Sequence, residues 1–198
     1  DDADLTVTGQ FTQDGAGHGA IGADITSTDA GISFANNLTL TGTDAIKVQT
    51  GEGTDDDFSV GGALTASNIP LLTIDAGALG DITVTSAANL GTGDLTITDA
   101  AVVQFGSSLD VDVFTQSDGT TSTTFVGAVS TTGNFTFSGQ ALTLERGNNR
   151  IGGAMSVTNA DVFKTLDVAD LTVTNNFEQR VLQCSIEPFI LKFFLRPA

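Results

Sequence analysis

The chain has few of the residues on which disulfide-rich proteins and many metalloproteins depend. Its 198 residues include one cysteine, one histidine and three prolines, and neither tryptophan nor tyrosine. A single cysteine, Cys184, excludes an internal disulfide. One histidine and one cysteine cannot supply the four nitrogen and sulfur ligands of a structural zinc site. With so little proline, long stretches are free to form hydrogen-bonded strands.

Positive charge is scarce as well. Seven Lys and Arg residues face 24 Asp and Glu residues, so the formal net charge is -17. Nucleic acids and anionic membranes both attract positive charge, so an acidic protein of this kind is not expected to bind either. The most apolar run, Ile186 to Leu195, is too short to cross a membrane and is interrupted by charged residues and a proline. We therefore expect no nucleic-acid partner and no membrane insertion.

The chain does contain repetition. The segment Asp4–Gln13 returns near the other end as Asp170–Gln179, and the short phrases Leu38–Thr41, Ile82–Thr85 and Leu95–Thr98 resemble both. Apolar and polar residues alternate in each phrase, which predicts a strand with one buried and one exposed face. Repeated short strands separated by Gly, Asn and Asp indicate a stacked β architecture.

A longer repeat defines the expected organisation. Residues from about 11 to 85 match residues from about 114 to 174, beginning with Phe11-Thr-Gln on Phe114-Thr-Gln. We predict an all-β parallel β-helix, or β-solenoid, over residues 1–179, with about nine coils of about 20 residues each. Residues 180–198 contain no Thr, Gly or Asp. They are predicted to be an atypical, non-repetitive tail: either a disordered or artefactual segment unrelated to the fold, or an amphipathic capping or docking segment. Because the chain opens Asp1-Asp2-Ala3-Asp4 without a signal peptide, we expect a mature product or an internal fragment.

Candidate catalytic residues are few. His18 lies in Gly17-His18-Gly19, a tripeptide that occurs in pectin-cleaving β-helix hydrolases, and Asp55–Asp57 superficially resembles their paired acids. The order is reversed here, and no Asn-Thr-Asp or Arg-Ile-Lys element accompanies it. There is no Gly-x-Ser-x-Gly motif to form a serine nucleophile with His18, and no base lies next to Cys184 in the sequence. We predict no catalytic residues and a protein that is not an enzyme.

Calcium is the cation whose binding the composition does not exclude. Carboxylates in predicted turns could supply oxygen ligands, although the helix-loop-helix and Gly-Gly-x-Gly-x-Asp patterns are absent. These carboxylates are Asp14, Asp24, Asp29, Asp44, Glu52, Asp55, Asp56, Asp57, Asp110, Asp112 and Asp118. Such acids usually stabilise the turns in which they lie, so the prediction is no metal site and no cofactor.

Pairs of threonines in the pattern Thr-x-Thr suggest a different surface. They begin at residues 6, 26, 39, 83, 96 and 172. On a solenoid face, threonine hydroxyls lie about 6.7 Å apart along a strand and ~4.8 Å apart between coils, a lattice that could order water. This arrangement resembles that of ice-binding β-solenoids, although the spacing of the pairs along the chain is irregular.

The phrase Leu-Thr-Val-Thr-Gly-x-Phe-Thr-Gln-Asp-Gly, followed by Ile25-Thr-Ser-Thr and Leu38-Thr-Leu-Thr-Gly, resembles the strand repeats of giant bacterial surface proteins. These include filamentous-haemagglutinin-like adhesins and autotransporter passengers. The resemblance covers residues 1–179 and implies a right-handed parallel β-helix that is secreted or displayed on the cell surface.

The expected function is therefore a non-catalytic structural or adhesive spacer in a long surface fibre. Its expected partners are neighbouring repeats of the same parent protein, and a cell-surface glycan or host receptor. Two alternatives stay open: a β-helix that binds or cleaves polysaccharide, and an ice-binding solenoid.

Overall fold

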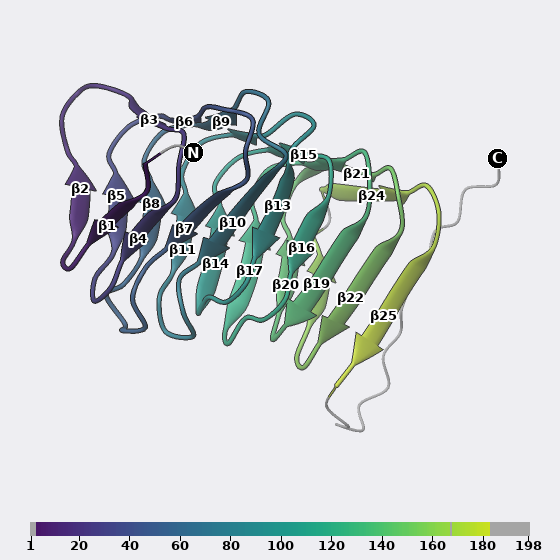
Figure 1. Ribbon diagram of the computed structural model, residues 1–198. Helices are drawn as coiled ribbons and strands as arrows, with labels where there is room; N and C mark the ends of the chain where they lie inside the picture. The colour runs from purple at the N-terminus through teal and green to yellow at the C-terminus, as the bar shows by residue number, and fades with distance from the viewer. Residues whose placement is uncertain (1–2, 167, 183–198) are drawn as a thin grey trace.

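The computed structural model describes residues 3–166 and 168–182, and it confirms the predicted fold class (Figure 1). All regular secondary structure in these residues is β, arranged in three parallel sheets. Accordingly, the described residues contain no helix long and apolar enough to cross a membrane. Successive strands visit sheets A, B and C in turn, so three strands make one coil. Eight coils are complete, and β25 begins a ninth.

Strands belonging to one sheet recur at every third position in the chain. Sheet A contains β1 (Leu5–Val7), β4 (Ile25–Ser27), β7 (Ile46–Gln49), β10 (Leu71–Asp75), β13 (Asp94–Ile97), β16 (Phe114–Gln116), β19 (Phe135–Gly139), β22 (Met155–Asn159) and β25 (Phe177–Val181). Sheet B contains β2 (Phe11–Gln13), β5 (Ile32–Phe34), β8 (Phe58–Val60), β11 (Ile82–Val84), β14 (Val102–Phe105), β17 (Ser122–Phe125), β20 (Leu142–Leu144) and β23 (Phe163–Thr165). Sheet C contains β3 (Gly19–Ile21), β6 (Leu38–Leu40), β9 (Leu64–Ala66), β12 (Ala88–Asn89), β15 (Leu109–Val111), β18 (Val129–Thr131), β21 (Gly147–Ile151) and β24 (Ala169–Val173).

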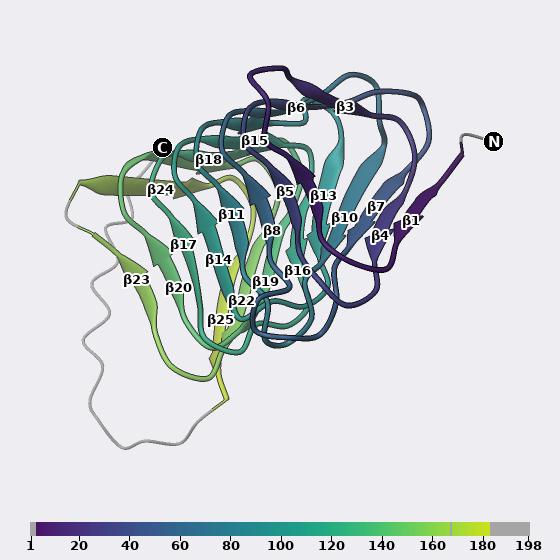
Figure 2. The ribbon, with the colours of Figure 1, turned by 90° about the vertical axis from the view of Figure 1, so that its left-hand side faces the viewer.

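The alternation of the strand phrases explains this arrangement. In β6, Leu38 and Leu40 are fully buried while Thr39 between them is partly exposed. Parallel register keeps like residues in line, as where Thr73 pairs with Thr96 and Ile74 with Ile97. Apolar side chains from all three sheets therefore meet inside the rod. Figure 2 shows the three sheets that surround this interior. At about 4.8 Å per coil, the eight coils span roughly 40 Å.

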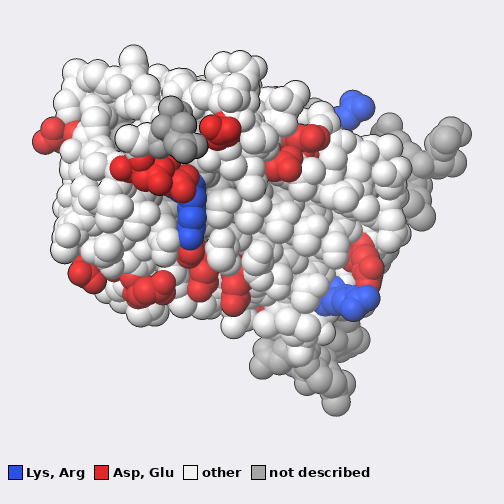
Figure 3. All heavy atoms as spheres, viewed as in Figure 1, with Lys and Arg blue, Asp and Glu red and all other residues white. Residues whose placement is uncertain are grey.

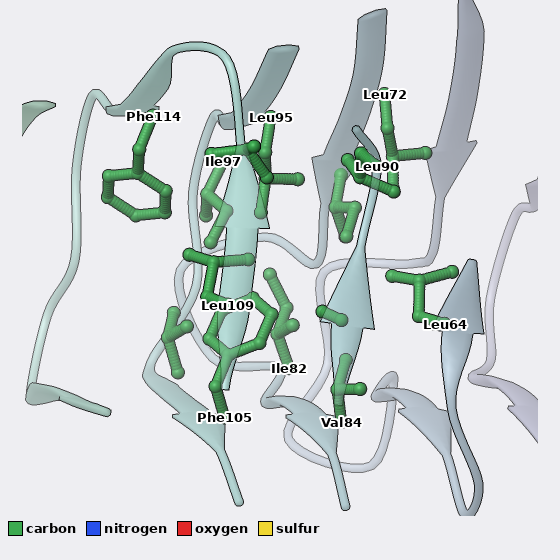
Figure 4. Close-up of a cluster of buried hydrophobic side chains, with 14 of the residues drawn as sticks. Leu64, Leu72, Ile82, Val84, Leu90, Leu95, Ile97, Phe105, Leu109 and Phe114 are labelled. Carbon is green, nitrogen blue, oxygen red and sulfur yellow. The ribbon is translucent and has the colours of Figure 1, made fainter. Parts of the chain in front are cut away.

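One continuous apolar core fills the interior. Leucine, isoleucine and valine from neighbouring coils interdigitate around Leu95 and Ile97 (Figure 4). Farther along the chain, phenylalanine dominates: the Phe114 and Phe135 rings stack with centroids 4.6 Å apart, and Phe125 meets Phe114 edge-on at 5.5 Å. Stacked and edge-on pairs of this kind add about 0.5–1.5 kcal/mol each beyond the area that they bury.

Aspartates at the start of a strand or directly before it connect one coil to the next. The Asp24 carboxylate accepts the backbone N–H of Lys47 at 2.7 Å, and the Asp57 carboxylate accepts that of Asp81 at 2.8 Å. The Asp4, Asp81 and Asp94 carboxylates accept the N–H groups of Asp24, Val102 and Val113 in the same way. Asparagine does so elsewhere, since Asn134 accepts the N–H of Ala154 at 2.9 Å.

The long sequence repeat does not stay on one face of the solenoid. Phe11–Gln13 forms β2 in sheet B, whereas its counterpart Phe114–Gln116 forms β16 in sheet A. Likewise Leu5–Val7 lies in sheet A and the matching Leu171–Val173 lies in sheet C. The strand phrase is therefore interchangeable among the three faces.

The predicted tail begins near the edge of the described region. The last strand of the described residues, β25, ends at Val181, so it includes Arg180 and Val181, the first two residues of the predicted tail. Residues 183–198, which make up most of that tail and include Cys184, lie outside the described residues.

Candidate functional site

The turns that lead from sheet A to sheet B form an acidic corner, hereafter the A–B corner. It carries Asp29, Glu52, Asp55, Asp56, Asp57, Asp81, Asp99, Asp118 and Asp161. In Figure 3, where sheet A faces the viewer, red atoms lie along the lower margin, toward which the strands of sheet A point. Carboxylates from several coils thus gather along one edge. The sequence of any one turn does not reveal this arrangement.

A shallow groove opens at this corner. It lies between the turn at residues 28–31 and the longer turn at residues 52–56, with Gln10 at its margin. Asp29, Glu52 and Asp55 are exposed there, while Asp56 is only 8% exposed. The Asp56 carboxylate accepts the N–H of Gly53 at 2.6 Å, so it closes its own turn. Only part of the predicted acidic triplet therefore faces the groove.

Two carboxyl groups at the corner have perturbed acidity. Burial raises the pKa of Asp81, and the nearby carboxylate of Asp57 raises it further. Burial also raises the pKa of Asp99, with additional repulsion from Asp118, Asp75 and Glu52. Oδ1 of Asp99 is buried without a hydrogen-bond partner. The corner is therefore a place of mutual repulsion between carboxylates at neutral pH.

The structure does not bring His18 to this groove. His18 directly precedes β3, in the turn from sheet B to sheet C, whereas Asp55–Asp57 directly precede β8 at the A–B corner. The imidazole is absent from the groove lining. The histidine and the acidic triplet thus occupy different corners of the rod.

The carboxylates considered for calcium are dispersed. Asp14 lies in the turn between β2 and β3, Asp24, Asp44 and Asp112 lie in turns from sheet C to sheet A, and Asp110 lies in β15. Asp29, Glu52, Asp55, Asp56, Asp57 and Asp118 lie at the A–B corner. Within residues 3–166 and 168–182, no group of three or more His, Cys, Asp or Glu side chains is placed to hold a metal ion.

A second surface is a lattice of hydroxyl groups on sheet A. Outward residues of β13, β16, β19 and β22 pair in register from coil to coil, as Thr96–Thr115–Thr136–Ser156. Two positions farther along the chain, Ser138 pairs with Thr158 in the same way, and Thr98 and Ser117 directly follow the ends of β13 and β16. In Figure 3 the corresponding part of the face is mostly white, between red atoms at its margins. Eight uncharged hydroxyls therefore cover four consecutive coils of an acidic protein.

The sequence concealed this lattice. The Thr-x-Thr pairs that begin at residues 6, 26 and 96 lie in sheet A, but those at 39 and 172 lie in sheet C and that at 83 lies in sheet B. The lattice instead uses Thr115-x-Ser117, Thr136-x-Ser138 and Ser156-x-Thr158. Accepting serine in place of threonine would have revealed four consecutive coils with the same pattern.

Comparison with protein-family models, curated proteins and solved structures found no match to this chain.

Proposed function

We propose that this chain is a non-catalytic structural segment of a long bacterial surface fibre, where it acts as a stiff spacer. The observation that carries the proposal is the core. Apolar side chains from three parallel sheets fill the interior through eight coils, so bending the rod would separate packed side chains and strain the ladders of backbone hydrogen bonds. Adhesion and surface location belong to the proposal through the resemblance of the strand phrases.

The acidic groove supplies the sharpest test of this function. A polysaccharide-cleaving β-helix would use Glu52 and Asp55 there, the exposed acids of the long turn. The purified chain is incubated with polygalacturonate and with cellulose, each with and without calcium, and released reducing ends and co-sedimentation are measured. We expect neither cleavage nor saturable binding, and small-angle scattering should show a particle with a stiff axis of roughly 40 Å. Cleavage that disappears in Asp55→Asn would overturn the spacer function.

The hydroxyl lattice favours a second function, ice binding. Its hydroxyls repeat at about 4.8 Å between coils and about 6.7 Å along a strand, a two-dimensional order that water molecules can adopt. Nanolitre osmometry tests this function through thermal hysteresis. If the lattice binds ice, Thr115→Lys in its middle removes the hysteresis, whereas the matched Thr83→Lys on sheet B leaves it unchanged. Absence of hysteresis in the unaltered chain excludes this function.

A further inference from the structure

The corner between β16 and β17 contains an Asp-Gly pair, Asp118-Gly119, whose reactive groups lie next to each other. The Gly119 N–H donates a hydrogen bond to Oδ1 of the preceding Asp118, with 2.7 Å between nitrogen and oxygen. The carboxyl carbon Cγ is bonded to that oxygen, so it lies at most about 1.2 Å farther from the nitrogen. Attack of this nitrogen on Cγ closes a cyclic imide, and atoms held about 3–3.5 Å apart are placed for such an attack.

Neighbouring coils hold the pair in this arrangement. The Gly119 carbonyl accepts the N–H of Gln140 at 3.0 Å, and the next amide, that of Thr120, donates to the carbonyl of Ala100 at 3.1 Å. Among the described residues, no backbone carbonyl accepts the Gly119 N–H itself. The reacting amide is therefore fixed by the groups around it, while its own proton is bound only to the carboxylate.

The buried side chain of Gln116 is placed to activate this amide. Its Nε2 donates a hydrogen bond to the Asp118 carbonyl oxygen at 3.1 Å, and its Oε1 accepts one from Oγ1 of Thr123 at 2.9 Å. Gln116 and Thr123 are each 1% exposed, so the donor has a fixed position. When the Gly119 nitrogen loses its proton, negative charge spreads to the Asp118 carbonyl oxygen, because both atoms belong to one conjugated peptide group. A donor aimed at that oxygen stabilises the charge, as the donors of an oxyanion hole do.

A second Asp-Gly pair, Asp14-Gly15, lacks this arrangement. Gln13 precedes it as Gln116 precedes the first pair, but Nε2 of Gln13 donates to the carbonyls of Gly15 and Gly17, both at 3.0 Å. Its amide therefore does not polarise the peptide group between Asp14 and Gly15. The side chains of Asp14 and Asp118 are both exposed to water. The two pairs thus share their residue types and differ in the contacts around the reacting amide.

We propose that Asp118-Gly119 is a site of spontaneous isomerisation, where the chain forms a succinimide that water opens to isoaspartate, with Gln116 stabilising the charge on the attacking amide. The N–Cγ bond forms as the amide proton passes to Oδ1 of the protonated carboxyl group, which gives a geminal diol, and loss of one water leaves the imide. Water then adds to the Asp118 α-carbonyl and breaks its bond to nitrogen, so the chain continues through Cγ. Addition at Cγ instead restores aspartate. The proposal is independent of the spacer function.

Labelling with the heavy isotope of oxygen tests the site. The purified chain is incubated in its folded state at neutral pH in isotopically enriched water, and the peptides that contain Asp118 and Asp14 are analysed by mass spectrometry. Each passage through the imide incorporates one heavy oxygen, and electron-transfer fragmentation distinguishes isoaspartate from aspartate. We expect Asp118 to be labelled about tenfold faster than Asp14, because its reacting atoms are held together. Absence of label at Asp118, or equal labelling of the two residues, would overturn the proposal.

The same measurement in concentrated urea separates the effect of the fold from that of the Asp-Gly sequence. Unfolding removes the contacts of Gln116 and frees both pairs, so the two aspartates should then be labelled at rates within about twofold of each other. If Asp118 kept its full advantage in urea, the flanking sequence and not the folded corner would be its cause, and the proposal would be wrong.

A substitution tests the role of Gln116. Thr123→Val removes the hydroxyl that orients the Gln116 amide but keeps the shape of the side chain, and it should slow the labelling of Asp118 by about tenfold. The matched control is Thr124→Val on the outward side of the same strand, which should leave the rate unchanged. An unaltered rate in folded Thr123→Val would overturn the role assigned to Gln116. The labelling of the unaltered chain decides the site itself, whether or not this variant folds.

Discussion

Coils 2–4 and coils 5–7 stack in the same way but contain different numbers of residues per coil. In sheet A the paired residues Ile46 and Leu72 lie 26 positions apart, whereas Leu95 and Phe114 lie 19 apart. The strands themselves keep nearly the same length, so the corners absorb the difference. In coil 3 the A–B corner occupies residues 50–57, and in coil 5 it occupies residues 98–101. The wide coils carry the acidic groove, and the narrow coils carry most of the hydroxyl lattice.

The interior differs between the two regions as well. Wide coils bury the single rings Phe34 and Phe58 among aliphatic side chains such as Leu72. The stacked ring pairs of the described residues, Phe105–Phe125 and Phe114–Phe135, lie in the narrow coils. The comparison suggests that corners can change freely, provided that each strand keeps its inward residues in register.

The largest expected effect comes from the aromatic core. Phe114→Ala should lower the free energy of unfolding by about 4 kcal/mol, because it leaves a cavity and removes the contacts with Phe135 and Phe125. Leu72→Ala in a wide coil should cost about 3 kcal/mol. Urea denaturation followed by circular dichroism measures both. A loss smaller for Phe114→Ala than for Leu72→Ala would contradict the assigned role of the rings.

Corners that pack closely on the preceding coil should tolerate an added side-chain carbon less well than open corners. A Cβ on Gly106 would meet the carbonyl oxygen of Thr85 in the preceding coil, so Gly106→Ala should cost about 1–3 kcal/mol. The control is Gly17→Ala, in the open turn before β3, where a Cβ would meet nothing within 4 Å. That change should stay within about 0.5 kcal/mol. Thermal unfolding of the two variants decides the matter, and equal losses would show that the corners do not differ in this way.

Removal of a corner aspartate should have a smaller effect. Asp24→Ala leaves the N–H of Lys47 without its carboxylate acceptor and should cost about 1–2 kcal/mol. Asp24→Asn should recover most of this loss, because Asn134 makes the equivalent contact with Ala154 in a narrow coil. Urea denaturation of both variants is the measurement. If asparagine were no better than alanine, the hydrogen bond would not be the source of the stability.

The smallest expected effect is a dependence on pH. A carboxyl group whose pKa is raised on folding binds its proton more tightly in the folded chain. Its favourable contribution is present below the unfolded value of 3.8 and is lost as the pH rises through the folded value. Asp81 and Asp99 should therefore make the protein slightly more stable as the pH falls from 7 toward that range.

Melting temperatures of the unaltered chain and of Asp99→Asn between pH 7 and pH 4.5 test this dependence. Asp99→Asn should raise the melting temperature at pH 7 and flatten its change with pH, while Asp44→Asn at a different corner should leave the slope in place. If the melting temperature of Asp99→Asn changed with pH as steeply as that of the unaltered chain, Asp99 would not contribute to the pH dependence of stability.

Several elements of the fold followed from local patterns. Alternation in phrases such as Leu38-Thr39-Leu40 predicted short strands with one buried face, and their repetition predicted a stack. Within the long repeat, Gly61-Gly-Ala-Leu64 matches Gly152-Gly-Ala-Met155, and this match also has a structural counterpart. In each, an asparagine of the preceding coil accepts the alanine N–H, and a Cβ on the second glycine would meet that asparagine. Local sequence and local geometry agree because both depend on neighbouring residues along the chain.

The candidate surfaces could not be predicted in the same way. The outward neighbour of Thr96 is Thr115, which is 19 residues away, but the outward neighbour of Thr73 in the preceding coil is Lys47, 26 residues away. These intervals depend on the length of each corner, so they cannot be predicted from the sequence of a single strand. The Asp99 carboxylate is likewise repelled by the carboxylates of Asp118 and Asp75, which the stacking of coils brings near it.

The sequence by itself determined that this protein is a stack of short β-strands with an acidic surface, because side-chain alternation and composition act through local geometry and total charge. The tertiary structure alone decided that three strands make a coil, which corner each acid occupies, and which hydroxyls form a lattice. The physical reason is the register of the strands. Hydrogen bonds between parallel strands bring together residues whose separation along the chain varies from 19 to 26 positions.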